Sequence, residues 1–417
     1  MYFYIILERK QVMKMLHFEI KKVFSKFKNK LALMLLLTML VVTSILTILR
    51  VEYFDGEGNS STGISAAKNL RAEKNKWAGY LTEEVFRKVV KENALISQSK
   101  EALSEDIREQ DKAYAKSQGI SDIIEIINMA YSEWRDYDGY AIDNVSVKEV
   151  KNIYQKRIST LKKWLDSGEE IFTDLQKKFL IQQYENLETP FYYEYADGWS
   201  ALLQNISTFI LILALIIGFL VSGIFSDEFQ TKADSIFFST KLGRNKAVLS
   251  KMSAGFLITT VFYVIFVLLY TSIVLFVLGA DGANCPIQFS LWRSVYNITF
   301  FQAYLFITAG GYIGTLFAAM FAMIVSAATR STATAAIVPF IILCAFPFLS
   351  RIITLPEICS FFPDQLLEVY LDIKESGLME LGGKVMTIAT VIIPVYMAAC
   401  LFLQPILYCV YKKAEVK

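Results

Sequence analysis

Pairs of adjacent carboxylates are the simplest groups in this 417-residue sequence that could do acid–base chemistry. Examples are Glu83 with Glu84 and Glu169 with Glu170, each in a polar stretch of helical periodicity, where a solvated helix face accounts for them. The single histidine, His17, lies in a basic amphipathic stretch and is expected to be an interfacial residue rather than a base or metal ligand. The sequence also lacks a GxxxxGK(S/T) phosphate loop, an HExxH pair, a GxSxG elbow and a CxxC motif. We therefore expect no catalytic residue, no metal site, no directly bound cofactor and no hydrolysis of ATP by this chain itself.

Long apolar stretches dominate the rest of the sequence. Apolar residues make up 54% of it, charged residues 20%, and mean hydropathy is +0.40, which is too apolar for a soluble enzyme of this size. A helix needs roughly 20 apolar residues to cross a membrane, and six stretches have that length: 31–49, 201–225, 252–279, 299–329, 332–350 and 385–411. Since lipid cannot satisfy backbone polar groups, each should be helical. The predicted fold class is an all-α polytopic membrane protein with six transmembrane helices, the first of them a retained anchor rather than a cleaved signal peptide.

Lys and Arg near the spans predict the orientation. Eight lie in residues 1–30, five lie in residues 226–252, and the short tail 412–417 carries three, whereas the short loops on the other side carry fewer. Both termini and the loop 226–251 are therefore expected in the cytoplasm, residues 50–200 outside, and the protein in the plasma membrane. None of the six spans contains an ionisable residue, so the sequence offers no site for a coupled ion.

Segments outside the spans have distinct patterns. Residues 1–30 form a basic amphipathic pattern that predicts a helix lying against anionic lipid at the inner interface, although a plain charged flank is an alternative. Because MYFYIILERKQV breaks this pattern, Met13 or Met15 is a candidate for the natural start. Residues 50–200 are polar with helical periodicity and contain no cysteine, which predicts a mostly helical extracellular domain without disulfides.

Aromatic, glycine and cysteine residues give further expectations. Tyr192, Tyr193, Tyr195 and Trp199 immediately precede the second span, where they are expected to form an aromatic belt at the outer interface, or else to contact substrate. Gly310 and Gly314 form a small-xxx-small face for close helix packing within the subunit. Residues 351–384 are too polar to span and too apolar for a free loop, which favours a re-entrant or interfacial outer hairpin. Cys285 and Cys359 are expected as free thiols, with a disulfide between them the alternative.

The loop between the second and third spans carries a more specific pattern. FSDEFQTKADSIFFSTKLGRNKAVLSK, residues 225–251, resembles the first cytoplasmic loop of ABC transporter permeases of the ABC-2 type, in which a short coupling helix follows the second span. Glu228 matches the acidic position of that loop, residues 227–239 match the helix, Arg244 matches the basic position and Lys251 matches the lysine before the third span. TPFYYEYADGWSALL and GADGANCPIQFS resemble stretches of such permeases from Gram-positive anaerobes that carry a large outer domain.

The resemblance implies a half-transporter. It would pair with a second permease subunit, identical or related, and dock two cytoplasmic ABC ATPases that use ATP and Mg²⁺; no nucleic acid is expected to bind. Ile236, Phe237 and Phe238 are apolar residues on a polar loop, and either an ATPase cleft or the membrane interface could bury them. The predicted function is export of an antimicrobial peptide or another amphipathic compound. Sodium export is an alternative, and a membrane-anchored sensor or ligand-binding protein without transport is an alternative of another class.

Overall fold

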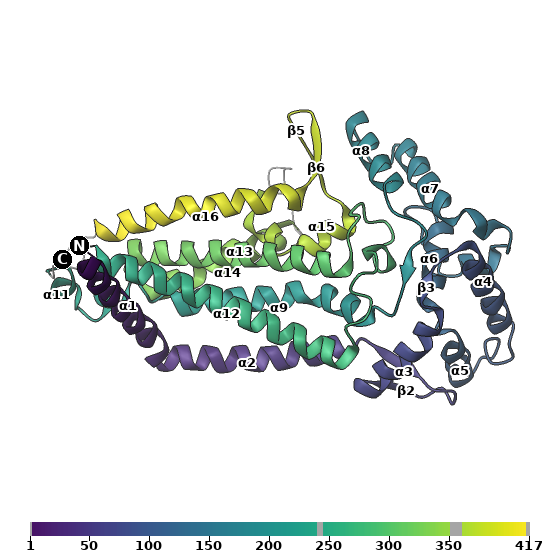
Figure 1. Cartoon of the computed structure of the whole chain (residues 1–417), viewed down its shortest axis with the longest axis horizontal. Coiled ribbons are helices and arrows are strands. Elements are labelled where there is room, and N and C mark those ends of the chain that lie inside the picture. The colour runs from purple at the N-terminus through teal and green to yellow at the C-terminus, as the bar shows by residue number, and fades with distance from the viewer. Residues whose placement is uncertain (1, 240–244, 351–360, 414–417) are drawn as a thin grey trace.

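The computed structural model describes residues 2–239, 245–350 and 361–413, with the side chains of residues 2–12, 237–238 and 346–350 left out. Most of the described chain is helical. Five helices are long and apolar enough to cross a membrane, and they run side by side in one bundle (Figure 1): α2 (Phe27–Ile48), α9 (Asp197–Val221), α12 (Lys246–Leu278), α13 (Phe300–Thr329) and α16 (Ile388–Lys412). This arrangement fits the predicted polytopic membrane protein.

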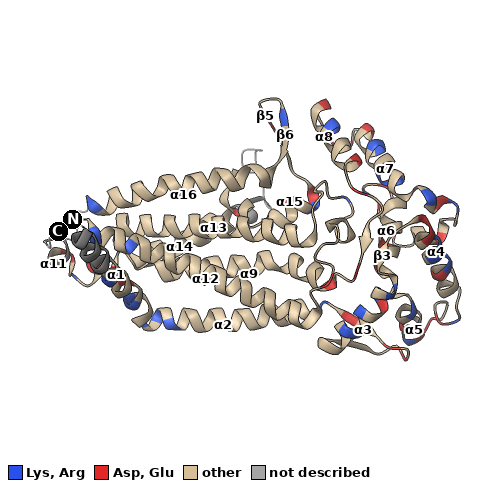
Figure 2. Ribbon diagram, in the orientation of Figure 1, with Lys and Arg blue, Asp and Glu red and all other residues tan. Residues whose placement is uncertain are grey.

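The two ends of this bundle differ in character. One end carries α1 (Tyr2–Ser25), the C-terminus and a cluster of lysines, and we call it the basic end; the other carries a helical domain, and we call it the domain end (Figure 1). Figure 2 shows charged residues concentrated at both ends and largely missing from the bundle between them. This distribution is the one expected when the middle of the bundle faces hydrocarbon.

The predicted fifth span, 332–350, falls on helix α14 (Thr332–Ser350). Its described apolar part, Thr332–Ala345, is shorter than the other five candidate spans. The helix packs against α9 and α13, and Pro339 comes so close to Gly218 that a Cβ at residue 218 would lie 2.2 Å from the proline ring. It therefore belongs to the bundle even though its apolar length is shorter.

The described part of the segment after α14 starts at residue 361 and packs against the bundle. It consists of the short turn η6 (Pro363–Leu366), α15 (Val369–Glu375) and the hairpin β5 (Leu378–Leu381) with β6 (Lys384–Thr387). η6 packs against α13, α14 and α16, and a Cβ on Gly310 would lie 2.9 Å from the backbone oxygen of Leu366. Gly310 is ten residues into α13, so this contact lies roughly 15 Å along the helix from its start. The described part of the predicted outer hairpin thus packs into the bundle, and we call residues 361–387 the re-entrant segment after that prediction; residues 351–360 lie outside the described residues.

Gly310 and Gly314 allow this close approach. A Cβ on Gly310 would also lie 2.7 Å from the Val369 side chain, and one on Gly314 would lie 3.1 Å from the Leu366 side chain. The small face of α13 therefore packs within the subunit, against the re-entrant segment and, at 3.5 Å from Gly310, against Ile393 of α16.

The domain at the far end is mostly helical. It contains α3 (Ile64–Lys74), α4 (Glu83–Ser97), α5 (Ile107–Ser117), α6 (Ser121–Tyr131), α7 (Ile153–Ser167) and α8 (Asp174–Glu185). Two small antiparallel pairs complete it: β1 (Glu52–Phe54) with β2 (Ser60–Thr62), and β3 (Gly79–Tyr80) with β4 (Tyr192–Tyr193). Its core includes Trp292 from the loop between α12 and α13, and the buried Arg157 donates to the backbone oxygens of Trp292 and Ser294 at 3.0 Å each. The domain is therefore fixed to the bundle through this loop.

Candidate functional site

The basic end holds a cluster of buried charges formed by segments far apart in the sequence. Helix α1 lies across this end of the bundle and turns into α2 at Lys26, whose backbone is extended. Val23 of α1 is buried, and Phe24 stacks on Phe262 of α12 with ring centroids 5.4 Å apart. One face of α1 therefore packs on protein, and this turns Glu19 inward.

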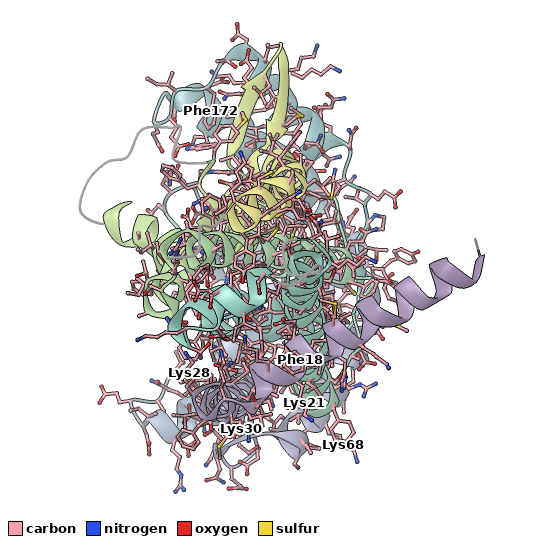
Figure 3. The ribbon with its side chains drawn as sticks, turned by 90° about the vertical axis from the view of Figure 1, so that its left-hand side faces the viewer. Phe18, Lys21, Lys28, Lys30, Lys68 and Phe172 are labelled. Atoms are coloured by element: carbon pink, nitrogen blue, oxygen red, sulfur yellow. The ribbon has the colours of Figure 1, made fainter. Side chains whose placement is uncertain are left out.

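The opposite part of α1 and the start of α2 face outward. Figure 3 looks onto the basic end and shows Phe18, Lys21, Lys28 and Lys30 around it. Phe18 is 65% exposed, and the three lysines are exposed as well. A helix with this surface fits the predicted interfacial position, although its apolar residues are shared between the protein and the outside.

The segment after α9 forms two short helices rather than the single helix predicted over 227–239. These are α10 (Asp227–Gln230) and α11 (Asp234–Ser239), and between them Lys232 adopts a left-handed backbone with φ +55°. The amide of Lys232 donates to the oxygen of Phe229 and the amide of Ala233 donates to the oxygen of Glu228, which closes α10 as a helix C-cap. This cap is the physical reason for the break.

Lys251 is the centre of the charge cluster. It lies in the first turns of α12, its side chain is 0% exposed, and its Nζ donates to Glu228 Oε1 at 2.8 Å, to Glu19 Oε2 at 3.0 Å and to the backbone oxygen of Ile224 at 2.9 Å. Three oxygens thus satisfy the three hydrogens of the ammonium group. A buried lysine is stable only with such partners, so Lys251 joins α1, the end of α9, α10 and α12.

Two further groups hold Glu228 and its neighbour. Lys22 Nζ donates to Glu228 Oε1 at 2.6 Å, and the buried hydroxyl of Tyr411 in α16 donates to Glu228 Oε2 at 3.3 Å. Lys26 forms an ion pair with Asp227. We call Glu19, Lys22, Lys26, Asp227, Glu228, Lys251 and Tyr411 the buried charge cluster.

The pKa values in this cluster follow from its packing. Burial alone would raise the pKa of Glu228, but Lys251 and Lys22 outweigh it and hold that pKa below its usual value. Burial opposes the charged form of Lys22, yet the Glu228 carboxylate more than offsets this and raises the pKa of Lys22. At Lys26 burial prevails over Asp227 and the pKa is lowered. Glu228 and Lys22 are therefore charged near neutral pH, and Glu228 forms ion pairs with both Lys22 and Lys251.

The other predicted residues of this loop are only partly described. Ile236 of α11 is 72% exposed at the surface of the basic end. Phe237 and Phe238 lie on α11, but their side chains, like all of Arg244, lie outside the described residues. Of the six residues predicted to couple to an ATPase, the structure brings Glu228 and Lys251 together.

Sequence reasoning missed Glu19, Lys22, Lys26 and Tyr411. Each lies more than 180 residues along the sequence from Asp227 and Glu228. Lys22, Lys26 and Tyr411 contact these carboxylates directly, and Glu19 is linked to them through Lys251. Glu19 carried the one available signal, because it is the acidic residue among the lysines between His17 and Lys30. Ser226 and Thr332 were also missed; their hydroxyls lie 2.7 Å apart and connect the start of α10 to α14.

At the domain end, three of the four residues predicted to form an aromatic belt at the outer interface are buried inside the protein. Tyr193 and Tyr195 are buried: the Tyr193 hydroxyl donates to Asp122 at 3.0 Å and the Tyr195 hydroxyl donates to the backbone oxygen of Leu278 at 2.7 Å. Trp199 is also buried and donates to the oxygen of Ala280 at 3.0 Å. Tyr195 and Trp199 thus join this region to the end of α12, whereas Tyr193 belongs to the core of the domain. Tyr192 alone of the four is well exposed and could face an interface.

A second buried lysine lies beside these rings. Lys74 of α3 donates to Asp122 of α6 at 2.7 Å and to both carboxylate oxygens of Asp197, the first residue of α9, at 2.7 and 2.8 Å. Burial alone would lower the pKa of Lys74, but the two carboxylates outweigh it and raise that pKa. The lysine therefore ties the domain to the beginning of α9.

One buried carboxylate has no such partner. Asp364 of η6 is 3% exposed, and its Oδ1 makes no hydrogen bond, while Oδ2 accepts one from Gln365 at 3.2 Å. The six predicted spans contain no ionisable residue, but the re-entrant segment lies outside them and carries this carboxylate into the bundle. Within the described part of the chain, no three His, Cys, Asp or Glu side chains are grouped to hold a metal ion, and Cys285 is a free thiol; Cys359 lies outside that part.

The buried charge cluster contains no activated nucleophile and no open ligand position, so its chemistry is the positioning of helices. Comparisons of the chain with protein-family models, with curated proteins and with solved structures gave no match.

Proposed function

We propose that the protein is the permease subunit of an ATP-driven ABC exporter of the ABC-2 type, in the plasma membrane. The basic end would lie in the cytoplasm with both termini, and the helical domain would lie outside. The observation that carries the proposal is the attachment of α10 to three other helices, α1, α12 and α16, through Glu228 and Lys251. A loop that only joins two spans needs no such anchoring.

The geometry suits transfer of motion. Rigid-body movements pass between domains when packed elements keep their contacts and move together. Because Glu228 is bonded to α1, α12 and α16, a push on α10 would move these helices as a unit. The exposed Ile236 on α11 is available to an ATPase docked at this end.

The partners follow from the same proposal. Two cytoplasmic ABC ATPases would supply the energy from ATP with Mg²⁺, and a second permease subunit, identical or related, would complete the translocation path. The proposed substrate is an antimicrobial peptide or another amphipathic compound, because α2, α12 and α16 expose apolar side chains along the bundle from which such a compound could enter.

The test is whether a neighbouring gene encodes an ABC ATPase, followed by reconstitution of that ATPase with this protein. The two proteins should co-purify, and the permease should stimulate ATP hydrolysis. Ile236→Ser should reduce this stimulation by about tenfold, since burying an isoleucine contributes about 1.5–3 kcal/mol to an interface. Phe18→Ser is the matched control, because Phe18 is similarly exposed at the same end but lies on α1. Absence of co-purification would favour the sensor, and equal effects of both variants would refute the assignment of α11 as the docking element.

Export of sodium is a second candidate, and Asp364 favours it. A buried carboxylate with an unpartnered oxygen inside the bundle is the kind of group that binds a cation during transport. If Asp364→Asn loses sodium export while its peptide transport is unaffected, sodium export is favoured over peptide export as the function.

A further inference from the structure

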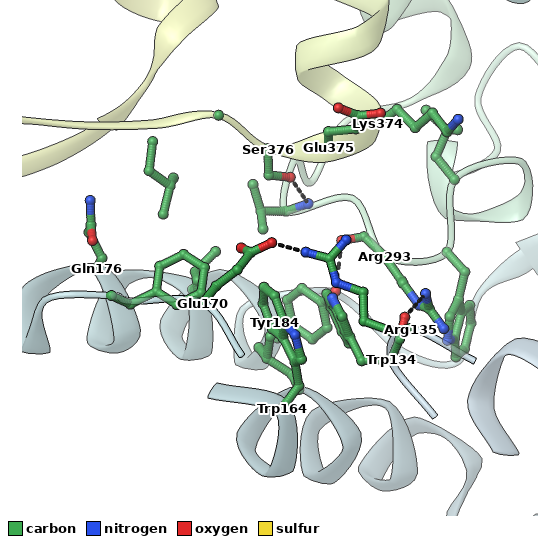
Figure 4. A pocket seen from close by; sticks show the side chains of 18 of the residues that line it. Trp134, Arg135, Trp164, Glu170, Gln176, Tyr184, Arg293, Lys374, Glu375 and Ser376 are labelled. Carbon is green, nitrogen blue, oxygen red and sulfur yellow. Dashed lines mark hydrogen bonds and ion pairs between the residues drawn. The ribbon is translucent and has the colours of Figure 1, made fainter. Parts of the chain in front are cut away.

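A cavity of about 670 Å³ lies between the helical domain and the re-entrant segment. Its walls come from α7 and α8, from the loop 290–295 and from the stretch that joins α15 to β5 (Figure 4). Ligand pockets in proteins typically have about 300–1,000 Å³. The cavity is thus large enough for a ligand, and it is separate from the buried charge cluster at the opposite end.

Aromatic rings form one wall. Trp134 and Trp164 stack with ring centroids 4.5 Å apart, and Phe172 meets the edge of Trp164 at 5.2 Å. Figure 4 shows Trp134, Trp164 and Tyr184 grouped on one side of the cavity. Rigid aromatic surfaces of this kind bind apolar side chains with little loss of conformational entropy.

The same wall holds a hydrogen-bond donor without an acceptor. The indole Nε1 of Trp164 is buried and makes no hydrogen bond with any described group. A buried donor without a partner costs about 1–3 kcal/mol. Because this nitrogen is buried, a ligand in the cavity does not reach it, and Trp164 contributes the apolar surface of its ring.

Charged groups of both signs surround the aromatic wall. Arg135 is paired with Glu170, and the guanidinium of Arg293 donates to the backbone oxygen of Glu133 at 2.9 Å and to that of Trp134. Lys374 and Glu375 are exposed on the facing wall, next to each other at the end of α15. An acyl chain would offer no partner to Lys374 and Glu375, whereas a peptide can carry side chains of both signs.

Ile171 lies at the mouth of the cavity and is 99% exposed. A single exposed isoleucine is common on protein surfaces. Here it extends the aromatic wall outward, so a ligand seated on Trp164 and Phe172 would also cover it.

We propose that this cavity binds a short amphipathic peptide segment, with an apolar side chain against Trp134 and Trp164. Side chains of both signs on the peptide pair with Lys374 and Glu375. That such a peptide is also the transported substrate rests on the proposed function, whereas its binding does not.

The full-length protein in lipid nanodiscs provides the test. The probe is the acetylated, amidated hexapeptide KLFELF, which lacks tryptophan, so that quenching of the protein's tryptophan fluorescence reports binding, with calorimetry as a second measurement. Saturable binding is expected. Ile171→Ser should weaken it about tenfold, and Trp164→Phe, which leaves a smaller ring surface for the peptide, should weaken it about two- to tenfold.

The matched control is Ile107→Ser, which changes an isoleucine that is 73% exposed on α5, away from the cavity. It should bind the peptide as the unchanged protein does. Tighter binding of dodecanoate or pyrophosphate than of the peptide, equal effects of the two isoleucine variants, or no saturable binding would each overturn the proposal. Peptide binding without co-purification of an ATPase would refute the exporter and leave this site intact, and the reverse result would do the opposite.

Discussion

Replacing Lys251 by methionine keeps the length of the side chain but removes the ammonium group to which three oxygens are bonded. Glu228 retains Lys22 and Tyr411 after this change, whereas Glu19 loses its ion pair with Lys251. The variant therefore leaves a carboxylate in the interior without its main partner. We expect a large loss of stability even though methionine is itself suited to a buried position.

The magnitude follows from the distances. At 3.0 Å and an effective dielectric constant of about 20, one ion pair contributes about 5 kcal/mol of Coulomb energy before desolvation. Removing one member of a buried pair typically costs about 3–5 kcal/mol, because the remaining charge stays desolvated. Lys251→Met should accordingly lower the free energy of unfolding by about 3–5 kcal/mol.

Unfolding in mixed micelles, titrated with a denaturing detergent and followed by tryptophan fluorescence, measures this difference. Lys21→Met is the matched control, since Lys21 is exposed on α1, and it should change stability by less than about 0.5 kcal/mol. Combining Lys251→Met with Glu19→Gln should recover at least about 1.5 kcal/mol, because the double variant no longer buries an unpaired carboxylate. A loss below 0.5 kcal/mol for Lys251→Met, or no recovery in the double variant, would refute the reasoning about the cluster.

Three further outcomes can be measured in the same way. The pKa of Glu228 is lowered in the folded protein, so its stabilising contribution is present above the usual value of 4.5 and is lost as the pH falls through the lower folded value; Glu228→Gln should flatten this dependence of unfolding free energy on pH. Gly310→Ala should cost about 1–3 kcal/mol because its Cβ would meet the backbone oxygen of Leu366 at 2.9 Å, whereas Gly56→Ala, with nothing within 4 Å, should change little. Asp364→Asn should leave stability unchanged or raise it by about 1 kcal/mol, since it removes a buried charge that no cation balances; a loss of 2 kcal/mol or more would mean that the carboxylate is structural.

The long helices were predictable because hydropathy is a local property. The stretches 201–225 and 252–279 correspond to α9 (Asp197–Val221) and α12 (Lys246–Leu278), with differences only at the ends. Both helices begin before the apolar run does, with Asp197 and Lys251 in their first turns. The predicted spans began only after these charges, because an average of hydropathy over neighbouring residues does not distinguish a charge that faces water from one that is paired inside the protein.

The sites were less predictable because they depend on pairing across the chain. Glu228 and Lys251 were identified by a loop pattern, but their partners Glu19 and Tyr411 come from the two ends of the sequence. Tyr193 and Tyr195 suggested a lipid interface by their position before a span, and their burial results from hydrogen bonds to residues more than 70 positions away. The break at Lys232 depends on a backbone conformation that the residue type does not favour.

The two buried lysines, Lys74 and Lys251, form hydrogen bonds at opposite ends of helix α9. Asp197 at the start of α9 accepts hydrogen bonds from Lys74 of the domain, and Ile224, just past its end, accepts one from Lys251. The 25 residues of α9 span roughly 37 Å, and most of its side chains are packed against neighbours, so the helix resists bending. Under the proposed function, a displacement of α10 would therefore pass along α9 as a shift of the whole helix. It would reach the domain at Lys74 and Asp122, which join α9 to α3 and α6.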